Sequence, residues 1–313
     1  MGLFSLSGGV TFDPSIDIPQ LDGKVILVTG ANTGLGKQTV LELARHRPAK
    51  IFLTARTLDK ANHAIAEIHQ AVSDVALEPL DLDLCSLQSV QQAAKVFTSS
   101  SERLDILFLN AGIMAHPEGI TNDGYEIQFG TNHVGHALLT KLLLPTLLRT
   151  AKEIPNSEVR VIVLSSNGHN FAPEGGIRFD VVKSNGEALG AVARYGQSKL
   201  ANILFAQELA RRYRELTVSS VHPGIVITNL TNVMVETSFW MKIAMKLITP
   251  LQGVQVEEGV KNQLWASTAP NVISGEYYEP VGVAGRGNKY TRDPKLAEEL
   301  WDWTEKELNE LKL

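Results

Sequence analysis

The sequence has few of the features that mark specialised classes of protein. Cys85 is the single cysteine among 313 residues, which excludes a disulfide within the chain and any metal cluster built on several cysteines. No apolar run reaches the roughly 18 residues that a membrane-spanning helix needs. Basic residues form no block and the net charge is −5, which argues against a nucleic-acid partner. We therefore expect a protein of a reducing compartment, the cytoplasm.

The two ends of the chain carry weak signals. Met1 to Val10 lacks the basic start and apolar centre of a secretory signal. The final Leu311-Lys-Leu313 differs at one position from the peroxisomal Ser-Lys-Leu, so the peroxisome stays open as an alternative location, as does peripheral membrane association. Residues 1–20 lack periodicity and are expected to form an arm. Without any linker signal, residues 21–313 are expected to form one domain.

What the chain does contain is an alternation of strand and helix patterns. Short apolar runs rich in β-formers occur at residues 24–28, 50–54, 76–82, 105–110 and 159–164. Helical periodicity separates them, for example over Leu58–Ala71, and a further helix is expected near Val256–Ser267. This rhythm predicts an α/β fold with one doubly wound parallel sheet and right-handed crossovers.

A glycine-rich stretch, Thr29–Gly36, follows the first strand directly, and a helix pattern begins at Lys37. Glycines permit positive φ angles and close approach of a ligand to the backbone. The N-terminus of the following helix would offer free N–H groups to a phosphate. The context predicts a dinucleotide site. A tight turn without a ligand is the alternative.

The second strand bears on the choice of nucleotide. Dinucleotide-binding folds commonly place an acidic residue near its end to bind the adenosine ribose. Residues 51–58 contain no acid, but they contain Arg56, whose fork of donors suits a 2′-phosphate. Lys37 could add a second positive charge. We therefore predict NADP(H), with an exposed loop arginine as the alternative for Arg56.

Tyr195-Gly-Gln-Ser-Lys199 opens another helical pattern, in which Tyr195 and Lys199 stand at i and i+4 on one face. A nearby cation stabilises phenolate and lowers the pKa of a tyrosine. The pair therefore suits acid/base chemistry between a carbonyl and an alcohol. A surface tyrosine beside a solvated lysine is the alternative.

The helical pattern over residues 126–150 contains Asn132, His133 and His136. Asn is unfavourable inside a helix, so Asn132 either faces outward or has a specific role. No carboxylate or third histidine stands at ligand spacing beside the two histidines, so we expect no metal site and structural roles for both.

These motifs, in this order, resemble those of the short-chain dehydrogenase/reductase family over about residues 20–285. They are Thr29–Gly36, Asp83-Leu84, Asn110-Ala-Gly112, Asn132, Ser166, Tyr195-xxx-Lys199 and Pro223-Gly224. Within the family the chain is similar to retinol dehydrogenases and WW-domain oxidoreductases, without a WW domain, and to fungal and plant reductases. The resemblance implies a Rossmann-type sheet of about seven strands in the order 3-2-1-4-5-6-7 with helices on both faces, and a ketoreductase of secondary metabolism.

The resemblance also implies residue roles. Tyr195 would pass the proton, Lys199 would lower its pKa and hold the nicotinamide ribose, Ser166 would bind the substrate oxygen, and Asn132 would organise a water chain. The implied cofactor-binding set is Gly30, Asn32, Thr33, Gly34, Leu35, Gly36, Lys37, Arg56, Asp83, Leu84, Asn110, Ala111, Gly112, Tyr195, Lys199, Pro223, Gly224, Val226 and Thr228.

An apolar stretch at about residues 229–252 follows the Pro-Gly turn and is expected to be a substrate lid. Its apolar side chains Phe239, Trp240 and Ile243 predict an apolar substrate: a terpenoid, polyketide, aromatic ketone or retinoid-like compound. Core packing or a homodimer contact are the alternatives for this stretch. For the whole chain, the alternatives to an oxidoreductase are a silent NADP-binding regulator and an enzyme with a non-redox net reaction, such as an epimerase or dehydratase.

Overall fold

The chain folds around a parallel sheet, described by a computed structural model for residues 9–155, 157–224 and 255–311. Its strands are β1 (Val25–Val28), β2 (Lys50–Ala55), β3 (Leu77–Asp81), β4 (Ile106–Leu109), β5 (Val159–Leu164), β6 (Leu216–Val221) and β7 (Tyr277–Tyr278). They form a seven-stranded sheet in the order β3-β2-β1-β4-β5-β6-β7. The predicted fold and strand order are confirmed.

The central strands consist mainly of apolar residues, which suits a position in the middle of the sheet. Every residue of β1, β4 and β5 is buried, as expected of strands covered on both faces. Ile26 of β1 pairs with Ile51 of β2 on one side and Ile106 of β4 on the other. The strand order reverses between β1 and β4, which is where doubly wound sheets bind their ligands.

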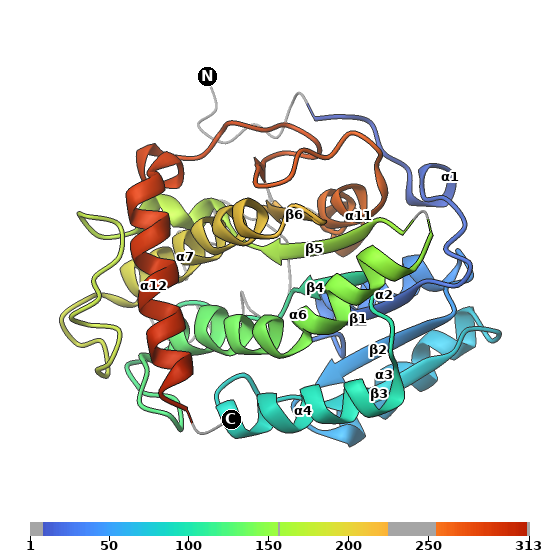
Figure 1. Cartoon of the computed structure of the whole chain (residues 1–313), viewed down its shortest axis with the longest axis horizontal. Helices are drawn as coiled ribbons and strands as arrows, with labels where there is room; N and C mark the ends of the chain where they lie inside the picture. The colour runs from blue at the N-terminus through green and yellow to red at the C-terminus, as the bar shows by residue number, and fades with distance from the viewer. Residues whose placement is uncertain (1–8, 156, 225–254, 312–313) are drawn as a thin grey trace.

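Helices cover both faces of the sheet (Figure 1). One face packs against α4 (Leu87–Ser100), α6 (Gly135–Glu153) and α7 (Ala191–Arg212). The other packs against α2 (Gly34–Ala44), α3 (Leu58–Ala71) and α11 (Lys261–Thr268). The remaining helical segments are α1 (Pro14–Asp17), α5 (Ile127–Phe129), η1 (Gly130–Val134), η2 (Asn167–Phe171), α10 (Val256–Gly259), η3 (Lys289–Arg292) and α12 (Pro294–Asn309). Figure 1 shows α12 lying across α7, outside the first layer.

Three expected helices differ in detail. The helix expected to begin at Lys37 begins at Gly34, because the last glycines of the turn form its first turn, where N–H groups need no helical partner. The single helix expected over 126–150 is interrupted by the π-helical turn η1. The helix expected near 256–267 divides into α10 and α11.

The domain division stays a prediction. The described part of the expected arm lies against the body, because Phe12 and Ile18 are buried and Val10 donates its N–H to Val281 O at 2.9 Å. The expected lid at 229–252 lies outside the described residues. Among the residues that are described, no helix is long and apolar enough to cross a bilayer.

Candidate active site

The glycine turn after β1 brings α2 very close to the strands. Gly30 and Gly34 have φ angles of 63° and 53°, which favour glycine. A Cβ on Gly36 would collide with the carbonyl oxygen of Gly30 and would lie 2.6 Å from Asn110 Nδ2. Only glycine fits at position 36, so the N-terminus of α2 is held directly at the carboxyl end of β1.

The predicted phosphate-binding residues surround that N-terminus. Gly30 is tied to β2 through its N–H, which donates to Thr54 Oγ1 at 3.1 Å. Asn32, Thr33 and Leu35 keep part of their surface exposed. Free N–H groups at the start of an 11-residue helix are suited to a phosphate. The turn therefore has the shape and the donors of a dinucleotide site.

Thr29, which the sequence-based site prediction omitted, joins the ends of β1 and β4. Its hydroxyl accepts the N–H groups of Asn110 at 2.8 Å and Ala111 at 3.0 Å. Asn110 Nδ2 returns a hydrogen bond to Thr29 O at 2.8 Å. The only sequence signal for this role was a polar residue directly after an apolar strand.

His136 extends this connection to Asn132. Its Nε2 lies 2.9 Å from Thr29 Oγ1 and its Nδ1 lies 3.1 Å from Asn132 O. Burial lowers the pKa of His136 to about 3, so the ring is neutral. A carbonyl can only accept, so we assign the proton to Nδ1. The single proton of the Thr29 hydroxyl then faces two acceptors, His136 Nε2 and Phe108 O at 3.1 Å.

Asn132 faces inward and lies in the π-turn η1, a feature often found at functional sites. Its Oδ1 accepts the N–H of Ile113 at 2.8 Å, and its Nδ2 donates to Ile113 O and to Ser198 Oγ, each at 2.9 Å. The side chain is completely buried. Asn132 thus fixes the segment after Gly112 against α7.

Tyr195 and Lys199 share one face of α7, as predicted, and both are buried. Lys199 Nζ lies 5.8 Å from the centre of the Tyr195 ring and donates to Leu164 O at 3.0 Å. Burial lowers the pKa of Lys199 to about 8. In the described part of the chain, no carboxylate forms a salt bridge with this ammonium.

The expected net lowering of the Tyr195 pKa is not found in this structure. Burial raises the pKa of Tyr195 to about 12, and the hydrogen bond with the Ser166 hydroxyl acts in the opposite direction. The reason is that desolvation of a phenolate at this depth outweighs the favourable interactions. At neutral pH the phenol therefore holds its proton.

Ser166 reaches Tyr195 because Gly168 leaves room between them. A Cβ on Gly168 would lie 2.6 Å from Tyr195 Cε1 and 3.3 Å from Ser166 Oγ. The structure thus brings Ser166, Tyr195, Lys199 and Asn132 together; Asn132 Oδ1 and Lys199 Nζ lie 3.0 and 3.4 Å from the position of a Cβ on Gly112.

The other predicted residues are distributed along the same edge of the sheet. Asp83 follows β3 and accepts the N–H of Cys85 at 3.0 Å, and Leu84 is buried beside it. Pro223 and Gly224 follow β6 and are partly buried. Val226, Thr228, Phe239, Trp240 and Ile243 lie outside the described residues.

The two basic residues expected at the 2′-phosphate differ in their surroundings. Lys37 Nζ forms a salt bridge with Glu67 at 2.7 Å. Arg56 is exposed and directly follows β2. Of the two cations, Arg56 has the freer side chain within the described residues.

The described residues fit a nicotinamide dinucleotide. A Cβ at position 36 would fill the space that the glycine turn Thr29–Gly36 leaves beside the start of α2. In the described structure Asn110 Oδ1 is buried without a hydrogen-bond partner, so it can accept a hydrogen bond from a ligand. The turn would hold the pyrophosphate, Asp83 and Asn110 would lie near the adenosine, and Lys199 would lie near the nicotinamide ribose. The described residues contain no cluster of metal-binding side chains.

Comparison with known proteins agrees with this geometry. The short chain dehydrogenase family profile matches residues 24–177. A short-chain dehydrogenase/reductase of Aspergillus calidoustus is 40% identical, over 95% of this chain and 97% of its own length. The chain belongs to the short-chain dehydrogenase family. It is therefore an oxidoreductase of a family that uses NAD(H) or NADP(H).

Two further relatives of this short-chain dehydrogenase extend the comparison. Retinol dehydrogenase 12 of Mus musculus is 36% identical, over 90% of this chain and 85% of its own length. A solved structure of an uncharacterized protein from Mycobacterium paratuberculosis superposes with a TM-score of 0.73 at 28% identity, covering 96% of this chain and 98% of that chain.

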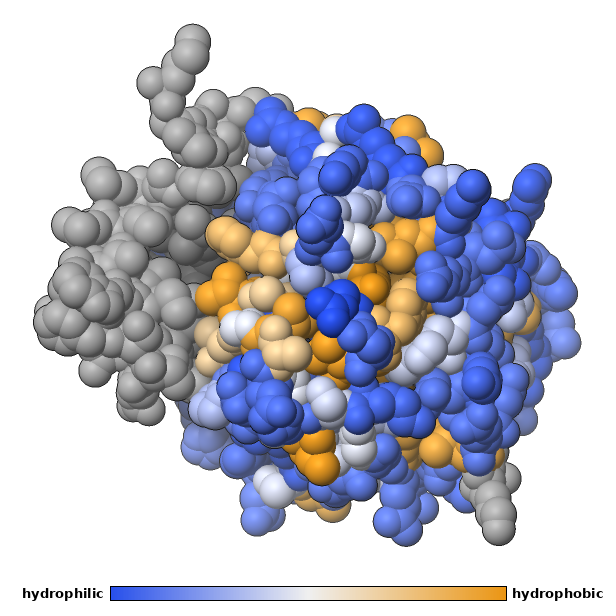
Figure 2. All heavy atoms as spheres, turned by 90° about the vertical axis from the view of Figure 1, so that its left-hand side faces the viewer, coloured by the Kyte–Doolittle hydropathy of each residue, from blue (hydrophilic) through white to orange (hydrophobic). Residues whose placement is uncertain are grey.

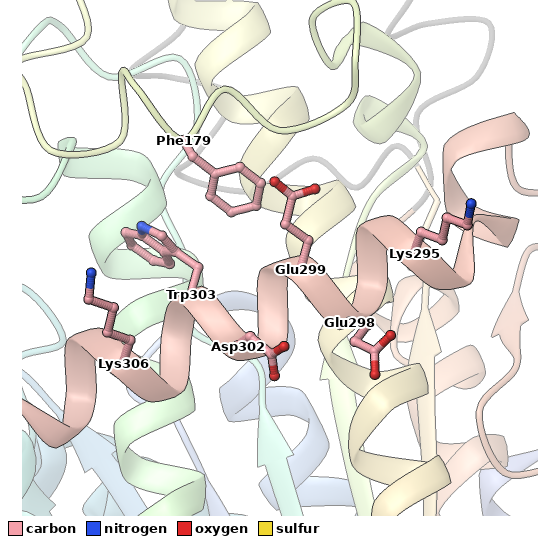
Figure 3. A pocket seen from close by; sticks show the side chains of 7 residues that line it. All are labelled: Phe179, Lys295, Glu298, Glu299, Asp302, Trp303 and Lys306. Atoms are coloured by element: carbon pink, nitrogen blue, oxygen red, sulfur yellow. The ribbon is translucent and has the colours of Figure 1, made fainter.

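A surface hollow on α12 is separate from this site. It is lined by Phe179, Lys295, Glu298, Glu299, Asp302, Trp303 and Lys306 (Figure 3). The Phe179 and Trp303 rings are tilted against each other with centroids 5.9 Å apart. Figure 2 shows the face of the protein that carries α12, where apolar residues are surrounded by hydrophilic ones. None of the lining residues belongs to the predicted site.

Proposed function

We propose that this protein is an NADP(H)-dependent oxidoreductase that interconverts a carbonyl and an alcohol on a small to medium apolar substrate. Tyr195 is the general acid and base, Ser166 binds the reacting oxygen, and Lys199 and Asn132 complete the site. The observation that carries the proposal is the buried Lys199 ammonium, unpaired by any described carboxylate, beside a buried tyrosine at the carboxyl edge of the sheet. Perturbed groups of this kind cluster at functional sites.

The protonation states support reduction of a carbonyl at neutral pH. Burial holds the pKa of Tyr195 at about 12, so the phenol carries the proton that a developing alkoxide needs. The Ser166 hydroxyl can donate a second hydrogen bond to the same oxygen. The bound cofactor supplies the hydride. In the opposite direction, Tyr195 would accept the alcohol proton.

The preference for NADP(H) rests on Arg56. It is exposed at the end of β2, where residues 51–58 contain no acid that would repel a 2′-phosphate. Lys37 would contribute only by leaving or sharing its salt bridge with Glu67. Arg56 is therefore proposed as the main contact of the 2′-phosphate.

The apolar substrate class rests on the sequence of residues 229–252 and on the relatives. Retinol dehydrogenase 12 is named for retinol, an alcohol that is almost entirely hydrocarbon. The remaining proposed cofactor contacts, Val226 and Thr228, precede this stretch.

Tyr195→Phe tests the chemistry. The substitution removes the proton donor and leaves a ring of the same shape in a buried position. We expect turnover of a panel of apolar ketones and aldehydes with NADPH to fall by about two orders of magnitude or more. NADPH binding, followed by the fluorescence of the nicotinamide, should weaken by less than about tenfold, because at most one hydrogen bond to the cofactor is lost while the glycine turn and Arg56 are unchanged. A variant that keeps most of its turnover would contradict the proposal.

Arg56→Ala tests the cofactor. A charge-assisted contact with the 2′-phosphate is worth roughly 1.5–3 kcal/mol, so the Michaelis constant for NADPH should rise at least about tenfold while that for NADH hardly changes. Lys60→Ala, at an exposed position of α3, is the control. Equal use of NADPH and NADH by the wild-type protein would refute the preference.

A further inference from the structure

Arg194 directly precedes Tyr195 in the first turn of α7, and its side chain points into the protein. Only 2% of the residue is exposed. A buried guanidinium needs partners for its fork of donors, because desolvation of an unpaired charge costs several kcal/mol. The partners of Arg194 come from three separate segments.

The guanidinium of Arg194 joins these segments at one point. Its Nη1 lies 3.0 Å from Glu126 Oε1, in a salt bridge whose side chains are 3% and 0% exposed. Its Nη2 donates to His116 O at 3.1 Å, and its Nε donates to Leu189 O at 3.2 Å. One side chain thus links the segment after Gly112, the start of α5 and the loop before α7.

The first of these segments runs from Ile113 to Pro117 and is fixed at both ends. The Asn132 side chain binds both the backbone N–H and the carbonyl oxygen of Ile113. Arg194 holds the carbonyl oxygen of His116. Between them Ala115 has a φ angle of 50°, in the left-handed region that a non-glycine residue adopts at a cost. Such a conformation persists only where the surroundings enforce it.

The second segment carries Asn132. The carboxylate of Glu126 that pairs with Arg194 also accepts the N–H of Phe129 at 2.7 Å, and so caps α5. The chain continues from α5 directly into the π-turn that contains Asn132. The direction of the Asn132 side chain therefore depends on Glu126, which depends on Arg194.

The third segment closes over the pair. Gly186 has a φ angle of 80°, and a Cβ there would lie 2.8 Å from Glu126 Cγ and would collide with Arg194 Cδ. The loop that ends at Leu189 thus packs its backbone directly on the ion pair.

We propose that Arg194 is a positioning residue for the reaction: it sets the relative placement of Tyr195, Asn132 and the 113–117 segment. The inference rests on the proposed function, in which Tyr195 is the proton donor and the other two groups lie beside it. Misplacement of reacting groups by about 1 Å can cost about a hundredfold in rate. The effect of Arg194 should therefore appear in kcat more than in cofactor binding.

The experiment replaces both members of the ion pair. Arg194→Met with Glu126→Gln removes both charges, so no uncompensated charge stays buried and the double variant is expected to fold. We expect kcat to fall about tenfold to a hundredfold, with the Kd for NADPH within about twofold of wild type. Arg194→Lys keeps the ion pair but loses the fork of donors, and should recover part of the lost kcat.

Arg160 supplies a control at the other edge of the sheet: a buried arginine in an ion pair whose carboxylate is exposed. It is 5% exposed, pairs with Glu158 at 2.7 Å and donates to Ala269 O at 2.7 Å, but it lies near the start of β5. Arg160→Met with Glu158→Gln should lower the unfolding temperature and leave kcat of the folded protein within about twofold of wild type. A merely structural role for Arg194 predicts equal behaviour of the two double variants.

Hydrogen exchange provides a readout that does not depend on turnover. Within residues 113–117, the Ile113 amide is the one with a described hydrogen-bond acceptor, Asn132 Oδ1. This amide should exchange faster in the Arg194 double variant and stay unchanged in the Arg160 double variant. Full kcat in the Arg194 double variant, or unchanged exchange at Ile113, would overturn the positioning role. Wild-type protein without turnover on any carbonyl or alcohol, but with these exchange differences, would instead refute the proposed function.

Discussion

Two buried charges at opposite edges of the sheet, Asp105 and Lys199, have opposite surroundings. At the amino edge, the fully buried Asp105 accepts Arg103 Nε at 2.6 Å and the N–H of Val25 at 2.9 Å, and Lys24 Nζ lies 3.4 Å away. At the carboxyl edge, Lys199 is also buried but donates only to a backbone carbonyl among the described residues. The first arrangement stabilises the fold, whereas the second keeps a charged group available.

This difference has a thermodynamic consequence. A buried cation without a carboxylate partner lowers the stability of the folded protein, because water solvates the ammonium better than the interior does. The lowered pKa of Lys199, about 8, expresses that cost. A fold retains such a group where chemistry requires it.

The largest expected effect comes from breaking the amino edge. Asp105→Ala leaves the cations of Lys24 and Arg103 without their buried partner and the N–H of Val25 without an acceptor. Removing one member of a buried ion pair costs about 3–5 kcal/mol, so the urea midpoint should fall strongly. The kcat of the protein that stays folded should equal that of wild type.

Asp180→Ala is the control for this loss. Asp180 pairs with Arg178 at the surface, with 64% of its side chain exposed, and such pairs contribute little. An Asp105 variant that keeps wild-type stability, or that loses kcat while folded, would erase the contrast between the two edges.

Local sequence patterns predicted much of the architecture and the central pair of the site. The strand runs, the helix over Leu58–Ala71 and the shared face of Tyr195 and Lys199 follow from periodicity, which is set by neighbouring residues. The salt bridge of Arg194 joins residues separated by 68 positions, and no local pattern encodes it. Likewise the π-turn at Asn132 depends on hydrogen bonds to Ile113 and Ser198, and so on tertiary contacts.

The electrostatics of the site were the least predictable part. Spacing alone suggested that Lys199 would lower the pKa of Tyr195, but the depth of both groups decides the balance, and burial raises that pKa to about 12. The burial of Tyr195 and Lys199 depends on the helices and loops packed around α7, and it cannot be inferred from the spacing of the two residues in the sequence.

The second prediction breaks the carboxyl edge at Lys199. Lys199→Met removes the buried cation and should stabilise the protein without cofactor at pH 7 by on the order of 3 kcal/mol, because the pKa of Lys199 is lowered from 10.5 to about 8. Turnover should fall by about two orders of magnitude or more, since the cation beside Tyr195 is lost. A variant that is both less stable and still active would show that Lys199 resembles the paired charges of the amino edge.

The pH dependence of stability sharpens this test. The folded pKa of Lys199 lies near 8 and the ordinary value is 10.5, so between these values the unfolded chain binds more protons than the folded protein. The contribution of Lys199 is therefore present above pH 10.5 and is lost as the pH falls towards 8. As the pH rises from 8 to 10.5, wild type should gain stability relative to Lys199→Met, as measured by urea unfolding at each pH. Parallel curves would contradict the lowered pKa.

The smallest expected effect comes from Gly168, which separates the Tyr195 ring from Ser166 without carrying a reacting group. A Cβ at this position would lie 2.6 Å from Tyr195 Cε1, closer than real Cβ contacts come, and the ring is buried and cannot swing into solvent. Gly168→Ala should therefore displace the phenol from the Ser166 hydroxyl and lower kcat about tenfold, with the Kd for NADPH unchanged. Gly190→Ala is the matched control, because Gly190 caps the same helix with nothing within 4 Å of a Cβ. Steady-state kinetics of both variants checks the comparison, and equal kcat values would mean that the packing of Gly168 against Tyr195 does not set the geometry of proton transfer.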